Sequence, residues 1–125
     1  MKRYEERRID LDNAIKSLKE GLSQEADDLR IDGVLQRFEF TFELAWKCIK
    51  DYLEIQGIVS SIGSPREIIQ LAYKHNIIDD GEKWIEMMLS RNNLSHMYDK
   101  NVSRNIYDKI KSEYVTLIEK LQDKI

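Results

Sequence analysis

The sequence is poor in residues that make turns and cross-links. Its 125 residues include five Gly, one Pro and one Cys. β-Sandwiches and barrels turn about every 8–12 residues, usually with Gly or Pro, so this composition argues against both. Cys48 cannot form an internal disulfide, and one Cys with two distant His residues cannot supply a zinc site. We therefore expect a reduced, buried thiol, no metal and no cofactor.

Long apolar runs and excess positive charge are also missing. No run approaches the roughly 20 apolar residues that a membrane span needs. The N-terminal residues 1–8 are too charged for a signal peptide. The net charge is −3, so the broad basic footprint of a duplex-binding protein is absent. We expect a cytoplasmic protein without a membrane partner, in which any contact with RNA is local.

Charged residues (34%) and hydrophobic residues (42%) are instead arranged with helical periodicity. The length fits a single domain over residues 1–125. A first helix is predicted over residues 4–21 and a second over 32–56, with Gly57 as the residue that ends it. The apolar stripes of these helices contain Tyr4, Leu11, Ile15, Leu18 and Leu22, and Val34, Phe38, Phe42, Ala45, Ile49 and Leu53. Phe40 and Trp46 widen the second stripe, which indicates a central helix or a subunit contact.

A polar hinge at 24–31 separates the first two predicted helices, and three further helices are predicted from a loop at 60–64 onward. A short third helix starts at Ser64 and Pro65 as a capping box and ends near residue 76. Asp79 and Asp80 cap a fourth helix, and Asp99 or Asn101 caps a fifth with the stripe Ile106, Ile110, Tyr114, Leu117, Leu121 and Ile125. Short connections favour antiparallel neighbours. The expected fold is all-α, an up-down antiparallel four-helix bundle with one extra short helix.

The polar run 91–98 interrupts the fourth helix where its apolar stripe should continue. On a helix Arg91 and Ser95 share one face, and Asn92 and His96 share the next, so two neighbouring faces become polar together. Such a change inside a bundle indicates a site or a symmetric contact. The alternative is a frayed helix end, in which Asn92 and His96 cap carbonyls. Most other Asp and Glu residues are interpreted as solvated helix faces.

The run 91–98 resembles the motif of the HEPN superfamily: Arg, a polar residue, three further residues, then His. Arg91, Asn92 and His96 match it in place, and Tyr98 matches an extended form with Tyr two positions after the His. The segments 37–47, 64–67 and 80–84 resemble the branch called nucleotidyltransferase substrate-binding proteins. The likeness covers nearly the whole chain in the same order.

The resemblance implies a homodimeric helical bundle that is encoded beside a minimal nucleotidyltransferase and forms a complex with it. In one branch the pair is a toxin–antitoxin system. There the helical protein is a metal-independent endoribonuclease, and the transferase silences it by adding AMP to the Tyr. Arg91, Asn92 and His96 would then be catalytic, with one His from each protomer in a shared cleft, and Tyr98 would be the AMP acceptor. The alternatives are a non-catalytic subunit that binds a substrate or docks on the transferase, and a Tyr98 ring packed on Trp84 or the last helix.

Overall fold

The computed structural model describes residues 2–58 and 63–125, and every regular element in them is a helix. The α-helices are α1 (Lys2–Leu22), α2 (Asp28–Ile55), α3 (Pro65–Lys74), α4 (Gly81–Asn92), α5 (Lys100–Lys109) and α6 (Val115–Lys124). A 3₁₀ turn, η1 (Asn93–His96), follows α4, and a π-helical segment, η2 (Ile110–Tyr114), joins α5 to α6. Of the predicted loop at 60–64, residues 60–62 lie outside the described residues.

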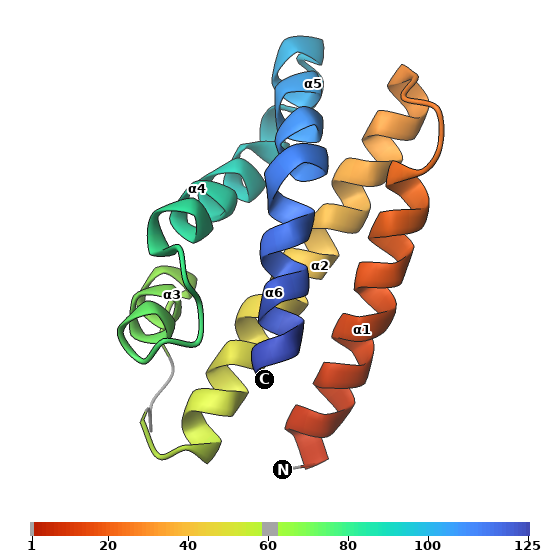
Figure 1. The fold of residues 1–125 in the computed structure, drawn as a ribbon. Coiled ribbons are helices and arrows are strands. Elements are labelled where there is room, and N and C mark those ends of the chain that lie inside the picture. Colours follow the sequence, from red (N-terminus) through yellow and green to blue (C-terminus); the bar gives the residue numbers. More distant parts are fainter. Residues whose placement is uncertain (1, 59–62) are drawn as a thin grey trace.

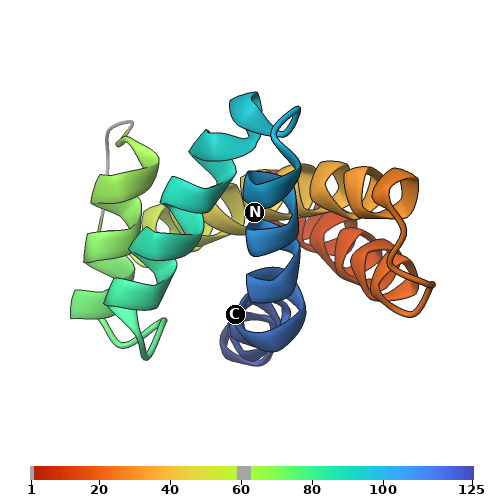
Figure 2. The same ribbon diagram turned by 90° about the horizontal axis from the view of Figure 1, so that it is seen from above.

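The helices form the predicted all-α bundle. Helices α1 and α2 run antiparallel as a long hairpin, and the continuous α5–η2–α6 helix lies beside them (Figure 1). Helix α4 crosses obliquely, and the short α3 lies next to α4 on the side away from α1 (Figure 2). Within the described ranges, no helix is long and apolar enough to cross a membrane.

The core contains the predicted stripe of α2 and its partners from every other helix. The six predicted stripe residues of α2 are all buried, as are Leu11, Ile15 and Leu18 of α1. Trp84 from α4 packs against Phe42, and Tyr114 stacks on Phe38 with ring centroids 5.7 Å apart. Cys48 is a buried free thiol, and burial raises its pKa to about 12. Helix α2 therefore lies at the centre of the bundle.

The predicted start of the second helix was four residues late. Asp27 accepts a hydrogen bond from the Arg30 amide at 2.8 Å, so α2 begins at Asp28. The first turn was missed because Leu29 is 82% exposed and adds nothing to the core stripe. The end was predicted correctly: Gly57 has a φ of 74°, the left-handed conformation that closes a helix.

The last helix departs from the predicted stripe after Tyr114. Asp99 caps α5, accepting hydrogen bonds from the amides of Asn101 and Val102. The wider turn of η2 then rotates the residues that follow it. Ile118 is consequently fully buried where Leu117, which is half-buried, was expected.

Candidate functional site

The motif spans the end of helix α4 and the short turn that follows it, and is not one continuous α-helix. Helix α4 ends at Asn92, and η1 carries the chain to His96. The predicted pairing of Asn92 with His96 on one α-helical face is therefore wrong, because a 3₁₀ turn aligns residues three apart. Leu94 is buried under the turn, and the Ser103 hydroxyl donates to the Met97 carbonyl at 2.5 Å. These contacts hold the backbone between Arg91 and Tyr98 against α5.

Arg91 is held by the central helix. Its Nη1 lies 2.9 Å from Oε2 of Glu43, and its guanidinium carbon lies 5.3 Å from the centre of the Phe42 ring. The side chain is only 21% exposed. Its Nε–H is buried and has no acceptor among the described residues. Arg91 is thus an oriented cation at the edge of a depression, and the exposed part of its guanidinium could donate to a phosphate oxygen.

Glu43 is a part of this arrangement that the sequence analysis did not single out. Its carboxylate also accepts from the Trp46 indole at 3.1 Å and pairs with Lys47 at 3.2 Å. Burial raises the pKa of Glu43, but these hydrogen bonds and the charges of Lys47 and Arg91 outweigh it, so the pKa lies below its usual value. The sequence signal was a single carboxylate within the apolar segment 40–46.

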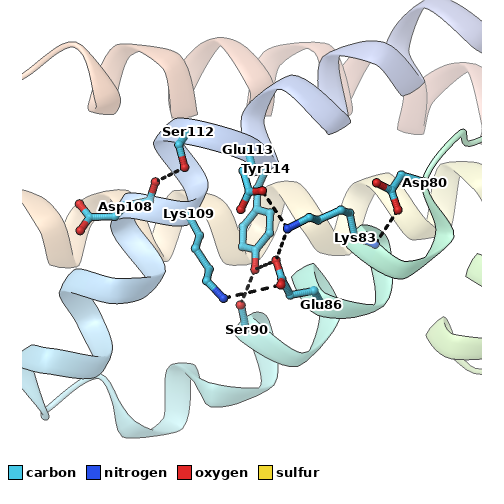
Figure 3. Close-up of polar contacts among 9 residues, drawn as sticks. All are labelled: Asp80, Lys83, Glu86, Ser90, Asp108, Lys109, Ser112, Glu113 and Tyr114. Carbon is cyan, nitrogen blue, oxygen red and sulfur yellow. Dashed lines mark hydrogen bonds and ion pairs between the residues drawn. The ribbon is translucent and has the colours of Figure 1, made fainter.

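A polar network fixes the end of α4 just before Arg91. The Tyr114 hydroxyl is 2.8 Å from the Ser90 hydroxyl and donates to Glu86 at 3.1 Å (Figure 3). Lys83 and Lys109 reach Glu86 from either side, at 3.5 and 3.7 Å. Burial raises the pKa of Tyr114 far above its usual range, so the phenol stays neutral. The π-helical turn of η2 thus positions Tyr114, whose hydroxyl holds the C-terminal part of α4.

His96 and Tyr98 are paired on the exposed side of the turn. The Nδ1 atom of His96 lies 3.4 Å from the Tyr98 hydroxyl, and the rings meet edge to face with centroids 6.0 Å apart. Tyr98 is 74% exposed, so the alternative of a ring packed on Trp84 or the last helix is wrong. In the part of the chain described here, neither Asn92 nor His96 donates a side-chain hydrogen bond to a carbonyl, as a frayed end would require.

Two neighbouring depressions flank the turn. The larger one, which we call the motif groove, has a volume of about 800 Å³ and is lined by Leu29, Asp32, Gly33, Leu35, Gln36 and Glu39 of α2 and by Arg91, Asn92, Leu94, Ser95 and Met97. The smaller one, which we call the Tyr98 cavity, has a volume of about 350 Å³ and is lined by Asp28, Ile31, Asp32, Met97, Tyr98, Lys100, Asn101, Ser103 and Arg104. The structure therefore brings Arg91 and Asn92 into one groove. It places Tyr98 in the other depression, in contact with His96.

No group of three or more His, Cys, Asp or Glu side chains that could hold a metal ion occurs in residues 2–58 and 63–125. His75, the other histidine, lies at the end of α3 and is exposed. The chemistry that the site residues themselves can provide is thus proton transfer by imidazole, charge stabilisation by guanidinium, and nucleophilic attack by a phenol.

Comparison with known proteins finds a curated relative and solved structures of the same fold. A curated relative named "Probable ribonuclease HepT", from Haemophilus influenzae, is 34% identical over 86 residues, which cover 66% of this chain and 59% of that protein. A crystal structure from Thermus thermophilus superposes with a TM-score of 0.82 and 27% identity, covering 90% of this chain and 96% of that one. A Haemophilus influenzae structure, described as the fold of a substrate binding domain of a nucleotidyltransferase, gives a TM-score of 0.85 and 27% identity over 93% of this chain and 96% of that one.

The sequence model of the family "Nucleotidyltransferase substrate binding protein like" matches residues 6–125. This match includes the whole motif and all but the first turn of α1. The chain belongs to the nucleotidyltransferase substrate-binding protein family, as its resemblance in sequence predicted.

Proposed function

We propose that this chain is a single HEPN-like domain that acts in the cytoplasm. Its partner is a minimal nucleotidyltransferase, and the two genes form a toxin–antitoxin-like system. In that system the chain is a metal-independent endoribonuclease, and Tyr98 is the residue through which the transferase silences it by adding AMP. The observation that carries the proposal is the intact set Arg91, Asn92 and His96 at the end of α4 and in η1, with Arg91 largely shielded, oriented by Glu43 and lining the motif groove beside Asn92. The name of the 34% identical relative, a ribonuclease, supports the same interpretation.

The residues suit RNA cleavage without a metal. A base removes the proton of the 2′-hydroxyl, whose oxygen attacks the neighbouring phosphorus, and an acid protonates the oxygen that leaves. Imidazole changes charge near neutral pH and can serve in either role. Arg91 supplies a positive fork, held in place by Glu43, for the phosphate as negative charge builds up. Asn92 lines the same groove, where its amide can orient the phosphate.

One imidazole per chain is short of an acid–base pair, and a two-fold dimer would supply the second. The face of α2 at the motif groove fits this role. Leu29 and Phe40 are exposed by 82% and 42%, and Gly33 between them presents no side chain. A dimer that packs this face of α2 against its copy would cover both of these exposed apolar side chains.

The protein should therefore be a homodimer in solution. Light scattering at micromolar concentration should give a mass near twice the 14.9 kDa of the chain. Leu29→Asp together with Phe40→Asp should shift the mass toward that of the monomer, because two charges would be buried at the interface. A monomeric wild type contradicts the shared cleft.

The purified protein should cleave RNA at the same rate with and without EDTA. The measurement is a time course on total RNA and on a defined single-stranded substrate, free of the transferase. Inhibition by EDTA, reversed by a divalent cation, would reveal a metal-dependent reaction and contradict the proposed chemistry.

The second candidate function is a non-catalytic subunit that presents a substrate or docks on the transferase. It is favoured by the net charge of −3 and by the acidic residues Asp32 and Glu39 in the motif groove, which repel RNA phosphate. A wild type without cleavage activity or toxicity, but with tight binding to the transferase, would decide for this candidate.

A further inference from the structure

The closest polar contact of the Tyr98 hydroxyl is the other functional side chain of the turn. His96 Nδ1 lies 3.4 Å from the Tyr98 oxygen, and both residues are exposed. We propose that His96 is the general base that activates Tyr98 as the acceptor of a nucleotidyl group. The inference rests on the proposed role of Tyr98 as acceptor, and it gives His96 a second reaction besides RNA cleavage.

The backbone that carries the two rings is held by local hydrogen bonds. The Met97 amide donates to the Leu94 carbonyl at 3.2 Å, and the Asp99 amide donates to the His96 carbonyl at 3.0 Å. Ser103 holds the Met97 carbonyl from α5. The two rings therefore project from a clamped turn on the same side, where they meet edge to face. Small rotations of exposed rings suffice to shorten the 3.4 Å separation when a substrate binds.

The chemical step is balanced with a nucleoside triphosphate as the only co-reactant. The Tyr98 oxygen attacks the α-phosphorus while its proton moves to His96 Nδ1. A new phosphorus–oxygen bond forms, the bond from the α-phosphorus to the β-phosphate oxygen breaks, and pyrophosphate leaves. The imidazolium then returns its proton to water. Nothing is oxidised or reduced. A neutral phenol is a weak nucleophile, so an adjacent base accelerates this step.

The charged residues around Tyr98 carry no strong net charge, so the imidazole of His96 is the feature that suits this site for activating the hydroxyl. Lys100 and Arg104 of α5 line the Tyr98 cavity, and so do Asp28 and Asp32 of α2. Lys100 is paired with Asp28 at 2.7 Å. These two cations and two anions give the lining a net charge near zero, so charge alone does not attract a triphosphate to the cavity. The specific feature of the site is the base already in contact with the hydroxyl.

The arrangement has a consequence for regulation. The imidazole that is needed for cleavage lies beside the oxygen that would receive the nucleotide. A nucleotide attached to Tyr98 would therefore lie against His96 and block its access to RNA. It follows that an intact His96 makes the chain both toxic and open to silencing, and that damage to His96 removes both properties together.

The test is the initial rate of nucleotide addition to the full chain by its cognate transferase with ATP, followed by intact mass spectrometry. His96→Ala and His96→Gln should slow the reaction by about 100-fold or more at saturating transferase, the usual contribution of general base catalysis. His96→Gln keeps a polar group near the hydroxyl but cannot take its proton. Imidazole in the buffer should restore part of the rate of His96→Ala. His75→Ala is the matched control, since that exposed histidine lies at the end of α3, and it should react like the wild type.

The outcomes separate this inference from the proposed function. A wild-type chain modified on Tyr98 together with an equally fast His96→Ala variant overturns the role of His96 alone. Full activity of His96→Gln, or a defect that appears only in KM, shows that His96 merely positions the partner and also overturns it. A wild-type chain that receives no nucleotide on Tyr98 overturns the acceptor role, and the role of His96 with it.

Discussion

Replacing Arg91 or His96 by Ala should abolish RNA cleavage and cell toxicity while the fold stays intact. Loss of a general acid–base group costs about 10²–10⁴ in rate, and loss of a donor that stabilises developing charge costs about 10²–10³. Both side chains lie outside the buried core, so neither replacement should open a large cavity. Cleavage assays and growth after induction in cells without the transferase measure the effect.

The environment of Arg91 allows a sharper variant. Arg91→Lys keeps the positive charge near Glu43 but removes the planar fork that can bind a phosphate through two donors at once. We therefore expect Arg91→Lys to be nearly as inactive as Arg91→Ala. Glu43 is partly exposed and keeps Trp46 and Lys47 as partners, so removing the guanidinium should leave the melting temperature close to that of the wild type.

Matched controls are available elsewhere on the surface. Arg66 and His75 lie at the two ends of α3 and are exposed. Arg66→Ala and His75→Ala remove the same side-chain types without touching the motif groove, and both variants should cleave RNA at the wild-type rate. Cleavage that persists in Arg91→Ala and His96→Ala at the level of these controls would show that the motif is not the active site.

The bundle was predictable because its signals are local. Apolar spacing located the core of α2, and short-range capping located most helix ends: Ser64 and Asp80 each accept a hydrogen bond from the amide three residues on. The errors in helix bounds and register arose where the local sequence pattern carries no information about the structure. An exposed first turn hid the start of α2, and the π-helical turn, which depends on packing around Tyr114, shifted the register of the last helix.

The site was predictable in its residues and less so in its geometry. The segment 91–98 was recognisable from its polar run, yet its change to a 3₁₀ turn, with Leu94 buried beneath it, is a tertiary feature that the polar run does not report. The ion pair between Arg91 and Glu43 joins positions 48 apart in the sequence, and no periodicity in a single sequence reports such a contact. The separation of the motif groove from the Tyr98 cavity likewise depends on how α2 and α5 pack.

Tyr98→Phe should produce a chain that its transferase cannot silence. The change removes only the acceptor oxygen. Because Tyr98 is 74% exposed and its hydroxyl makes one long contact, we expect a stability change within about 0.5 kcal/mol. Arg91, Asn92 and His96 remain, so cleavage should continue. In the free chain Arg91 is paired with Glu43 and lines the motif groove, whereas Tyr98 lines the Tyr98 cavity. A nucleotide on Tyr98 would therefore silence the wild type mainly by covering His96, and less by pairing with Arg91.

The measurement combines growth and intact mass. Cells that express the wild type with the transferase should grow and yield a chain heavier by one or more AMP units. Cells that express Tyr98→Phe with the transferase should stop growing and yield a chain of unmodified mass. Tyr73→Phe is the matched control, because Tyr73 is also largely exposed but lies on α3, and it should be modified and tolerated like the wild type. Nucleotide mapped to another residue, or a Tyr98→Phe chain that the transferase still silences, would assign the acceptor elsewhere and leave Tyr98 only as a neighbour of His96.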